Sequence, residues 1–255
     1  MKRKTAVITG ASSGIGMEFA RAFAKMGYRL VLTARRKERL EKLAAELPVP
    51  CHIITADLSQ ESECYQFCEK LENIRIDVFI NNAGFGTCGK FEESDLGKEV
   101  SMIHVNVRAM HILLKQVLKK MKRQGHGRIL NVASSAGLLP AGPYMATYYA
   151  TKSYVVSLTK AVAEELKEKK SKIYVGALCP GPVDTEFNER ADVVFALKGI
   201  SAKSCVREAL WGMKKRKVII VPTIKMKLCV AGQNLLPEQL LLKVVAMQQK
   251  RKMGR

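Results

Sequence analysis

The sequence has few of the residues that build metal sites and disulfide frameworks. Its 255 residues include four histidines and seven cysteines, and no two cysteines have C-x-x-C spacing. His104 and His111 lack the i, i+4 spacing of a helical metal pair. An odd number of scattered cysteines also argues against a disulfide framework. We therefore expect a reduced protein without a metal site.

Long hydrophobic runs are missing too. The start, "MKRKTAVITG", has a basic opening, but its apolar run is short and leads into turn residues. It is typical of a first β-strand and fits neither a signal peptide nor a membrane-spanning helix. We expect the protein in the cytoplasm.

Acidic residues are scarce relative to basic ones. The chain has 43 Lys and Arg against 23 Asp and Glu, a net charge of +20, and residues 203–255 hold 13 basic residues against two glutamates. Such a balance suits an anionic cofactor, a membrane surface or nucleic acid, although a solvated basic face explains it equally simply. Because no nucleic-acid-binding motif accompanies the charge, we expect no nucleic-acid partner.

Short apolar runs alternate with longer helical patterns along the chain. Seven runs read as strands, at residues 5–10, 28–34, 51–59, 76–84, 127–135, 172–182 and 217–222. Helical patterns cover residues 14–27, 36–48, a stretch reaching Leu71, 93–124 and 144–169. This alternation predicts an α/β fold: a Rossmann-like, doubly wound parallel sheet of about seven strands flanked by helices. No linker is visible, so we expect a single domain, with binding and catalysis in residues 1–222 and a basic extension in 223–255.

A glycine-rich turn follows the first predicted strand. In "TGASSGIG" the glycines are Gly10, Gly14 and Gly16, at the mouth of the first predicted helix. Glycine lets the backbone approach a pyrophosphate, which the positive end of a helix attracts. The spacing differs from the usual G-x-G-x-x-G of dinucleotide folds, so the turn alone is moderate support for a dinucleotide site.

The end of the second predicted strand indicates which dinucleotide is bound. A carboxylate there would bind the ribose hydroxyls of NAD, but this chain has Ala34, Arg35 and Arg36. A guanidinium suits the 2′-phosphate of NADP instead. We assign that role to Arg35 and regard Arg36 as the basic start of an exposed helix.

The stretch "TYYATKSYV" holds a candidate acid/base. Tyr148 and Tyr149 lie four and three residues before Lys152, so on a helix either phenol is a neighbour of the ammonium. A fixed positive charge stabilises phenolate and makes tyrosine a usable acid/base near neutral pH. Spacing does not choose between the two tyrosines, and aromatic packing on a helix face explains the pattern equally well.

Taken together, these segments resemble the short-chain dehydrogenase/reductase family from Thr5 to about Pro222. The resemblance rests on "TGASSGIG", "NNAG", "IHVNV", "NVASSAG", "YYATK" and "PGPVDT", in the family's order and approximate spacing. It implies an NADP-preferring oxidoreductase that interconverts a ketone or aldehyde and an alcohol. The family's Tyr-x-x-x-Lys pattern falls on Tyr148 and Lys152, which leaves Tyr149 as a packing neighbour. It also gives Asn106 the role of holding a water in the proton relay.

The resemblance leaves two candidates for the serine that binds the substrate oxygen. Counting thirteen residues back from Tyr148 gives Ser135, whereas the local pattern between Asn131 and Gly137 gives Ser134. We choose Ser134, because an insertion in the loop before Tyr148 explains the count, and keep Ser135 as the alternative. Its hydroxyl would stabilise charge on the substrate oxygen.

By the same resemblance a larger set of residues would contact NADP(H). Besides Arg35, Tyr148 and Lys152, this set is Gly10, Ser12, Ser13, Gly14, Ile15, Gly16, Asp57, Leu58, Asn82, Ala83, Gly84, Pro180, Gly181, Val183 and Thr185.

Substrate choice should lie in residues 185–204 and in the loop 138–145. The apolar side chains there suit a bulky ketone, hydroxysteroid-like or fatty-acyl-derived, and are Phe187, Val193, Val194, Phe195 and Leu197. A helix over residues 235–245 could pack on the same domain, dock on a neighbouring subunit or bind an anionic membrane surface. The family resemblance implies a homodimer or homotetramer, with contacts around residues 103–124 and 148–168.

Overall fold

Seven parallel strands form the centre of the molecule. The computed structural model describes residues 3–186, 199–233 and 236–252. The sheet runs in the order β3-β2-β1-β4-β5-β6-β9, and every neighbouring pair is parallel. Its strands are β1 (Thr5–Thr9), β2 (Arg29–Ala34), β3 (Cys51–Thr55), β4 (Val78–Asn81), β5 (Arg128–Val132), β6 (Tyr174–Leu178) and β9 (Ile219–Ile220). The order reverses between β1 and β4, so the predicted doubly wound sheet is confirmed.

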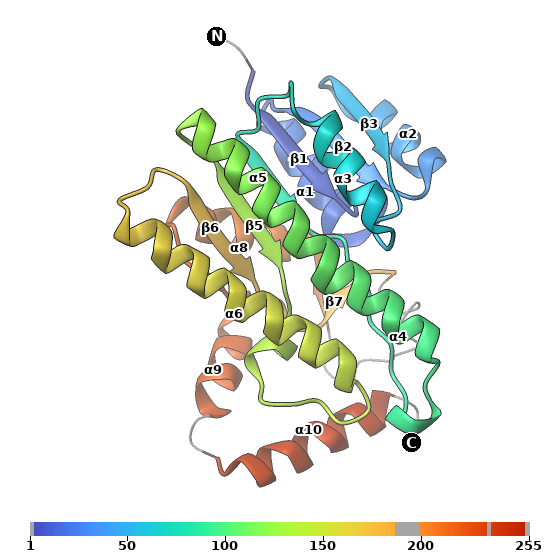
Figure 1. Cartoon of the computed structure of the whole chain (residues 1–255). Helices are drawn as coiled ribbons and strands as arrows, with labels where there is room; N and C mark the ends of the chain where they lie inside the picture. The colour runs from blue at the N-terminus through green and yellow to red at the C-terminus, as the bar shows by residue number, and fades with distance from the viewer. Residues whose placement is uncertain (1–2, 187–198, 234–235, 253–255) are drawn as a thin grey trace.

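Helices cover both faces of this sheet (Figure 1). One layer contains α1 (Gly14–Lys25), α2 (Lys37–Glu46) and α8 (Ala202–Lys214), and the other α3 (Glu61–Lys70), α5 (Met110–Gln124) and α6 (Ala146–Glu168). Short elements complete the described chain: η1 (Phe91–Glu93), α4 (Leu96–Ile103), η2 (His104–Ala109), η3 (Ser135–Leu138), and the pair β7 (Val183–Asp184) and β8 (Ile200–Ser201). Two further helices, α9 (Ile224–Gly232) and α10 (Glu238–Lys252), lie at one end of the molecule, beyond the sheet.

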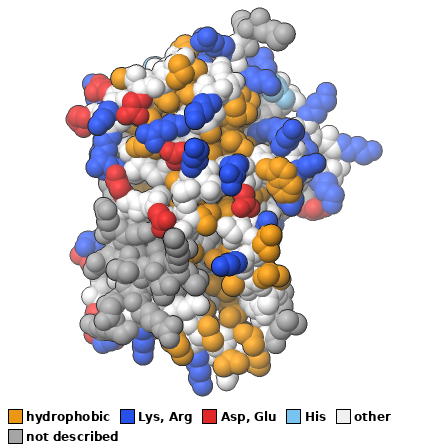
Figure 2. All heavy atoms as spheres, turned by 180° about the vertical axis from the view of Figure 1, so that it is seen from behind, with side chains coloured by type: hydrophobic (Ala, Val, Ile, Leu, Met, Phe, Trp, Pro, Cys, Tyr) orange, Lys and Arg blue, Asp and Glu red, His pale blue; other side chains and the backbone are white. Residues whose placement is uncertain are grey.

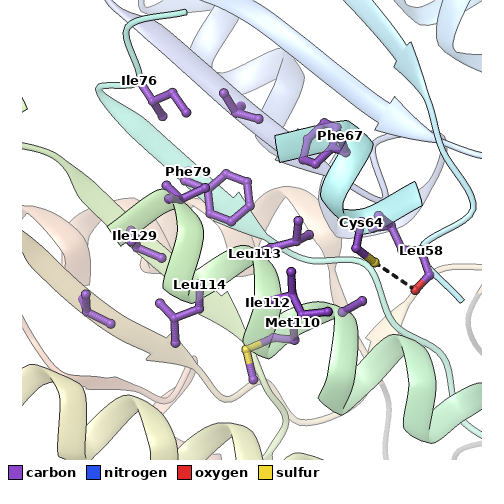
Figure 3. Close-up of a cluster of buried hydrophobic side chains, with 14 of the residues drawn as sticks. Leu58, Cys64, Phe67, Ile76, Phe79, Met110, Ile112, Leu113, Leu114 and Ile129 are labelled. Carbon is purple, nitrogen blue, oxygen red and sulfur yellow. Dashed lines mark hydrogen bonds between the residues drawn. The ribbon is translucent and has the colours of Figure 1, made fainter. Parts of the chain in front are cut away.

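Most residues of the central strands are apolar because both faces of these strands are buried, whereas the edge strand β3 is partly exposed. In β1, Val7 packs into the cluster beneath α3, α5 and α6, whereas Ile8 packs into the cluster beneath α1, α2 and α8. In β4, Phe79 belongs to the first cluster and Ile80 to the second. Figure 3 shows the first cluster, where Phe79 of the sheet meets side chains from α3 and α5. Alternate side chains of one strand thus fix helices on opposite sides.

The predicted helix over residues 93–124 differs in detail. It begins at Leu96, after the cap that Asp95 provides by accepting a hydrogen bond from Lys98 N at 2.8 Å. Between α4 and α5 it widens into the π-helical turn η2, which contains Asn106. π-Turns of this kind often occur at functional sites. Among the described residues, no helix has the length and apolarity needed to cross a bilayer.

The C-terminal prediction differs more. We expected a helix over residues 235–245, but the structure has α9 before it and a longer α10 from Glu238 to Lys252. The inner side of α10 is buried against the domain, because Val245 is 3 % exposed and packs with Met145, Tyr148 and Tyr149. In the structure the extension therefore contacts its own domain.

Candidate active site

A cavity of about 620 Å³ opens at the carboxyl ends of the strands. This is within the usual size of a ligand site, and the position beside the β1–β4 reversal is where doubly wound sheets bind ligands. The cavity brings together all but two of the predicted site residues. Those that line it are Gly10, Ser12, Ser13, Gly14, Ile15, Arg35, Asp57, Leu58, Asn82, Ala83, Gly84, Ser134, Tyr148, Lys152, Pro180, Gly181, Val183 and Thr185. Gly16 and Asn106 lie just behind its wall.

The glycine-rich turn forms a cradle that larger residues would fill. A Cβ atom on Gly16 would stand 2.2 Å from the carbonyl oxygen of Gly10, so the backbone approaches itself too closely for any side chain. Gly10 and Gly14 have φ of 64° and 53°, which glycine adopts readily. Ser13 is the N-cap of α1, and the first turn of that helix contains no acidic residue. The turn therefore fits a pyrophosphate, whose charge the helix end would attract.

The "NNAG" turn is tied to this cradle. Thr9 Oγ1 accepts hydrogen bonds from the backbone N–H of Asn82 at 2.9 Å and of Ala83 at 3.0 Å. The Asn82 amide donates in turn to the carbonyl oxygen of Thr9 at 2.9 Å. The two predicted cofactor loops are thus held in one fixed arrangement at the ends of β1 and β4.

Arg35 and Arg36, which follow β2, both line the cavity, but they differ in their exposure and in their partners. Arg35 is exposed and lines the cavity. Arg36 is partly buried, donates to Ser12 Oγ at 3.2 Å and forms an ion pair with Glu186 at 3.3 Å. Burial alone would raise the pKa of Glu186, but hydrogen bonds from Arg39 and Arg36 lower it. Sequence reasoning missed this cluster because Glu186 is 150 residues away from Arg36.

Asn106 occupies the π-turn and holds the loop after β4. Its amide donates to the Phe85 carbonyl oxygen at 2.9 Å and to Thr151 Oγ1 at 3.1 Å, while its Oδ1 accepts from Phe85 N at 3.1 Å. A Cβ on Gly84 would stand 2.8 Å from Asn106 Oδ1 and 3.3 Å from Lys152 Nζ. Both amide hydrogens of Asn106 are engaged, so any relay water that Asn106 holds must donate to one of its carbonyl oxygens.

Tyr148 and Ser134 meet on the cavity wall. The Tyr148 side chain is buried, and burial raises the pKa of its phenol to about 12 although hydrogen bonding with Ser134 lowers it. Ser134 also caps η3, because its hydroxyl accepts from Ala136 N at 3.1 Å. Ser135 also lines the cavity, but its backbone N–H donates to the Pro180 carbonyl oxygen at 2.8 Å. The geometry brings Ser134, rather than Ser135, to Tyr148.

Lys152 is a buried ammonium beneath the same wall. It is 5 % exposed, and burial lowers its pKa to about 8. Its Nζ donates to the Val132 carbonyl oxygen at 3.1 Å and lies 5.8 Å from the centre of the Tyr148 ring. At pH 7 it is therefore mostly protonated and supplies positive charge close to a neutral phenol.

Tyr149 lies beside Tyr148 but faces the C-terminal extension. The two ring centroids are 6.4 Å apart at an interplanar angle of 75°. The Tyr149 hydroxyl accepts a hydrogen bond of 2.7 Å from Gln249 Nε2, and burial raises the pKa of this phenol to about 12. Tyr149 thus lacks the serine and the lysine that accompany Tyr148.

The remaining predicted residues lie at the two ends of the cavity. Asp57 Oδ1 accepts from Ser59 N at 3.0 Å and fixes the turn after β3, and Leu58 is buried beside it. A Cβ on Gly14 would stand 3.1 Å from the Thr185 side chain, so that residue lies across the cradle. The apolar residues predicted for substrate choice between Phe187 and Leu197 lie outside the described residues.

Sequence reasoning missed the contribution of the C-terminal extension to the cavity. Residues of α9, α10 and the turn before α10 form one wall, and they are Met226, Cys229, Val230, Gly232, Gln233, Leu236, Leu241, Val244, Val245, Gln248 and Gln249. A mixed pattern of apolar and polar residues does not reveal which side of a helix faces a site that is distant in the sequence. The loop 138–145, which we did expect to contribute, provides Leu139 and Met145.

These contacts define what the site can do. A glycine cradle at a helix end fits a dinucleotide, and a phenol with a serine and a buried ammonium can exchange a proton with an oxygen atom beside it. Within the described ranges, no three His, Cys, Asp or Glu side chains come together as a metal site would require.

Comparison with known proteins agrees with this geometry. Residues 4–193 match the family of short chain dehydrogenases. A short-chain dehydrogenase from Sphingobium yanoikuyae in complex with NADPH is 32% identical, with a TM-score of 0.82 over 93% of this chain and 95% of that one. A bulky-bulky ketone specific alcohol dehydrogenase from Comamonas testosteroni is 30% identical, with a TM-score of 0.76 over 92% and 94% of the two chains.

A third structure carries the other nicotinamide cofactor. The short chain dehydrogenase/reductase from Burkholderia phymatum in complex with NAD is 25% identical, with a TM-score of 0.83 over 95% of each chain. The sheet order, the cradle, the tyrosine–lysine pair and these similarities agree, and the chain therefore belongs to the short-chain dehydrogenase/reductase family of oxidoreductases.

Proposed function

We propose that the protein is an NADP(H)-dependent oxidoreductase that interconverts a ketone or aldehyde and an alcohol, with Tyr148 as general acid/base. The observation that carries this proposal is the contact between Tyr148 and Ser134 above the buried Lys152, on the cavity that also contains the glycine cradle. When bound, the nicotinamide supplies or accepts the hydride. The alternative is a cofactor-binding scaffold without turnover, but such a protein has no need of the complete set of Asn106, Ser134, Tyr148 and Lys152.

The chain's own residues would control the proton and the charge. In reduction, the neutral phenol of Tyr148 donates its proton to the carbonyl oxygen, which the Ser134 hydroxyl also contacts. The ammonium of Lys152 stabilises the phenolate that remains. Asn106 holds the loop at Phe85 and Gly84 against Lys152. In the proposed relay, a carbonyl oxygen of Asn106 accepts a hydrogen bond from the water that returns the proton. In oxidation the same groups act in reverse.

The experiment follows NADPH consumption with aliphatic ketones, aldehydes, ketoesters and oxosteroids, and NADP⁺ reduction with the matching alcohols. We expect turnover with NADPH and a preference for bulky apolar ketones, because the wall from α9 and α10 is largely apolar. The Comamonas testosteroni enzyme, specific for bulky-bulky ketones, agrees with that substrate class. If NADPH binds and no compound reacts in either direction, the scaffold is the better explanation.

The preference for NADP(H) is proposed from Arg35. Its guanidinium lines the cavity and pairs with no carboxylate among the residues described, whereas Arg36 is already bound to Glu186. We expect Arg35→Ala to raise the KM for NADPH about tenfold or more, because a charge-assisted contact with the 2′-phosphate is lost. The KM for NADH should hardly change. Lys37→Ala, at an exposed lysine of the same segment, is the control and should leave both constants unaltered.

A substitution at Glu186 is expected to change the KM for NADPH in the opposite direction. Glu186→Gln removes a carboxylate from Arg36 and should lower the KM for NADPH. If Arg35→Ala or Glu186→Gln changed the KM for NADPH and the KM for NADH by the same factor, this result would contradict a 2′-phosphate site at the arginines after β2.

The outer side of the C-terminal extension is proposed as a contact surface. Its exposed apolar side chains are accompanied by lysines 225, 227 and 243, and they are Ile224, Leu228, Leu240 and Met247. Figure 2 shows hydrophobic side chains at this lower end of the molecule. We propose a cytoplasmic homodimer or homotetramer, built through the helices around 103–124 and 148–168 or through this surface, with weak binding to anionic membranes as the alternative use of the extension.

Two measurements separate these uses. Light scattering after gel filtration gives the oligomeric state, and Leu228→Ser with Leu240→Ser should reduce it if the extension is the subunit contact. If those substitutions instead abolish only sedimentation with vesicles of anionic lipid, the surface binds membranes.

A further inference from the structure

The amide of Gln249 is a buried polar group on the wall of the active-site cavity. It is 1 % exposed, and its Nε2 donates to the Tyr149 hydroxyl at 2.7 Å. Its Oε1 is buried and has no hydrogen-bond partner among the described residues. Leaving such an atom without a partner is unfavourable, because its desolvation is not compensated by a hydrogen bond. A ligand group in the cavity would remove that cost.

An apolar cluster lies beside Gln249 on this wall. Tyr149 and Val245 pack into it with Tyr148, and Leu241 and Leu139 lie against it. Besides Gln249, the amide side chains on this wall are those of Gln233 and Gln248. Gln249 is hydrogen-bonded to Tyr149, whereas Ser134 is the partner of Tyr148, so the amide would bind a part of the substrate separate from the carbonyl.

We propose that Gln249, held by Tyr149, binds a second hydroxyl group of the substrate, remote from the carbonyl that is reduced. This deepens the proposed function, on which it rests: the substrate class becomes hydroxyketones with a large apolar body. A hydroxyl fits because it can donate to Oε1, and because a site with an unpartnered buried polar atom discriminates against the analogue without the matching group. The Ser134–Tyr148 pair sets the reaction, and the Gln249–Tyr149 pair selects the substrate.

The test uses dodecan-2-one and a series of derivatives that carry one hydroxyl at successive carbons of the chain. For the wild type we expect kcat/KM to rise about tenfold or more at one or two hydroxyl positions, the discrimination that one buried hydrogen bond gives. In Gln249→Met, which keeps length but cannot accept the bond, that rise should vanish while dodecan-2-one is used at least as well. Gln239→Met, the same change at an exposed position of α10 outside the cavity lining, should keep the rise.

Binding gives a readout that does not need turnover. Calorimetry with the NADP⁺-loaded Tyr148→Phe variant, which lacks the group that would take up the alcohol proton, measures Kd for the same ketones without oxidation of the added hydroxyl. The same hydroxyl positions should lower Kd in this variant and not when Gln249→Met is added to it. If this pattern appears without turnover of any ketone, the proposed function fails and the Gln249 site stands.

A second outcome would contradict the inference about Gln249 and leave the proposed function intact. If dodecan-2-one and all of its hydroxy derivatives are reduced and bound equally well, or if Gln249→Met keeps the preference, then Gln249 does not bind a substrate hydroxyl and the proposed oxidoreductase activity is unaffected.

Discussion

Replacing Tyr148 with phenylalanine is expected to lower kcat/KM for carbonyl reduction roughly 1,000-fold, because a positioned proton donor contributes factors of about 100 to 10,000. The substitution removes one oxygen atom from a buried ring and keeps its shape, so the variant should fold and bind NADPH as the wild type does. Initial rates with the best ketone of the panel measure the first effect. Quenching of protein fluorescence on NADPH binding measures the second.

Tyr149→Phe is the matched control for that loss. It changes the adjacent residue of the same helix, which is equally buried and has the same direction of pKa shift. We expect it to reduce a simple ketone within about threefold of the wild-type rate, because the hydroxyl of Tyr149 accepts a hydrogen bond from Gln249, whereas the serine is the partner of Tyr148. Equal losses in both variants would mean that ring packing, rather than proton transfer by Tyr148, supports the activity.

The pair of tyrosines also shows what the sequence predicts and what it leaves open. Helical spacing placed both phenols near Lys152, and only the resemblance to the family selected Tyr148. In three dimensions the two differ through partners distant in sequence: Ser134 for Tyr148, and Gln249, 100 residues later, for Tyr149. Helical spacing relates only residues that are close in the sequence, so it cannot show which of the two tyrosines has the distant partners that the chemistry requires.

The fold was predictable for a local reason. Strands buried on both faces are short apolar runs, and glycine or proline residues mark their ends, so "TAVITG" and "KIYVGALCPGP" reveal β1 and β6 directly. The π-turn around Asn106 leaves no such mark, because the apolar positions on either side continue with helical spacing. The ion pair of Arg36 with Glu186 is equally invisible, since a surface helix also begins with basic residues. The sequence therefore did not predict the contacts between distant residues that form only when the helices and strands pack together.

Lys152→Met should have two opposite effects, and the first is on activity. Without the ammonium, the Tyr148 phenolate formed in reduction loses its stabilising charge. We expect kcat/KM to fall about 100-fold or more, in the range typical of acid/base groups. The same substitution at Lys160, an exposed lysine two turns along α6, should leave the rate unaltered.

The second effect is on stability without cofactor, and it follows from the lowered pKa. Burial lowers the pKa of Lys152 from 10.5 to about 8. Below pH 8 the ammonium is therefore charged in both the folded and the unfolded state, and water solvates this charge better in the unfolded chain. Between pH 8 and 10.5 the folded protein releases this proton while the unfolded chain keeps it, and the wild type gains stability as the pH rises. Lys152→Met lacks this dependence. We therefore expect Lys152→Met to have a higher melting temperature than the wild type at pH 7. The lost hydrogen bond to the Val132 carbonyl oxygen makes this gain in melting temperature smaller.

The melting temperatures of the two proteins should converge as the pH approaches 10.5, and calorimetric scans across this window measure the difference. Lys160→Met corrects for the general effect of removing a positive charge from a protein of net charge +20. A constant difference across the pH range would mean that Lys152 has the same pKa in the folded and unfolded states, so that burial does not destabilise its ammonium. A difference that already narrows with rising pH around pH 7 would mean that Lys152 is neutral in the folded state there, which would remove the electrostatic basis of the proposed acid/base pair. A difference that is level near pH 7 and narrows only above pH 8 would mean that the site keeps a buried charge at the expense of stability.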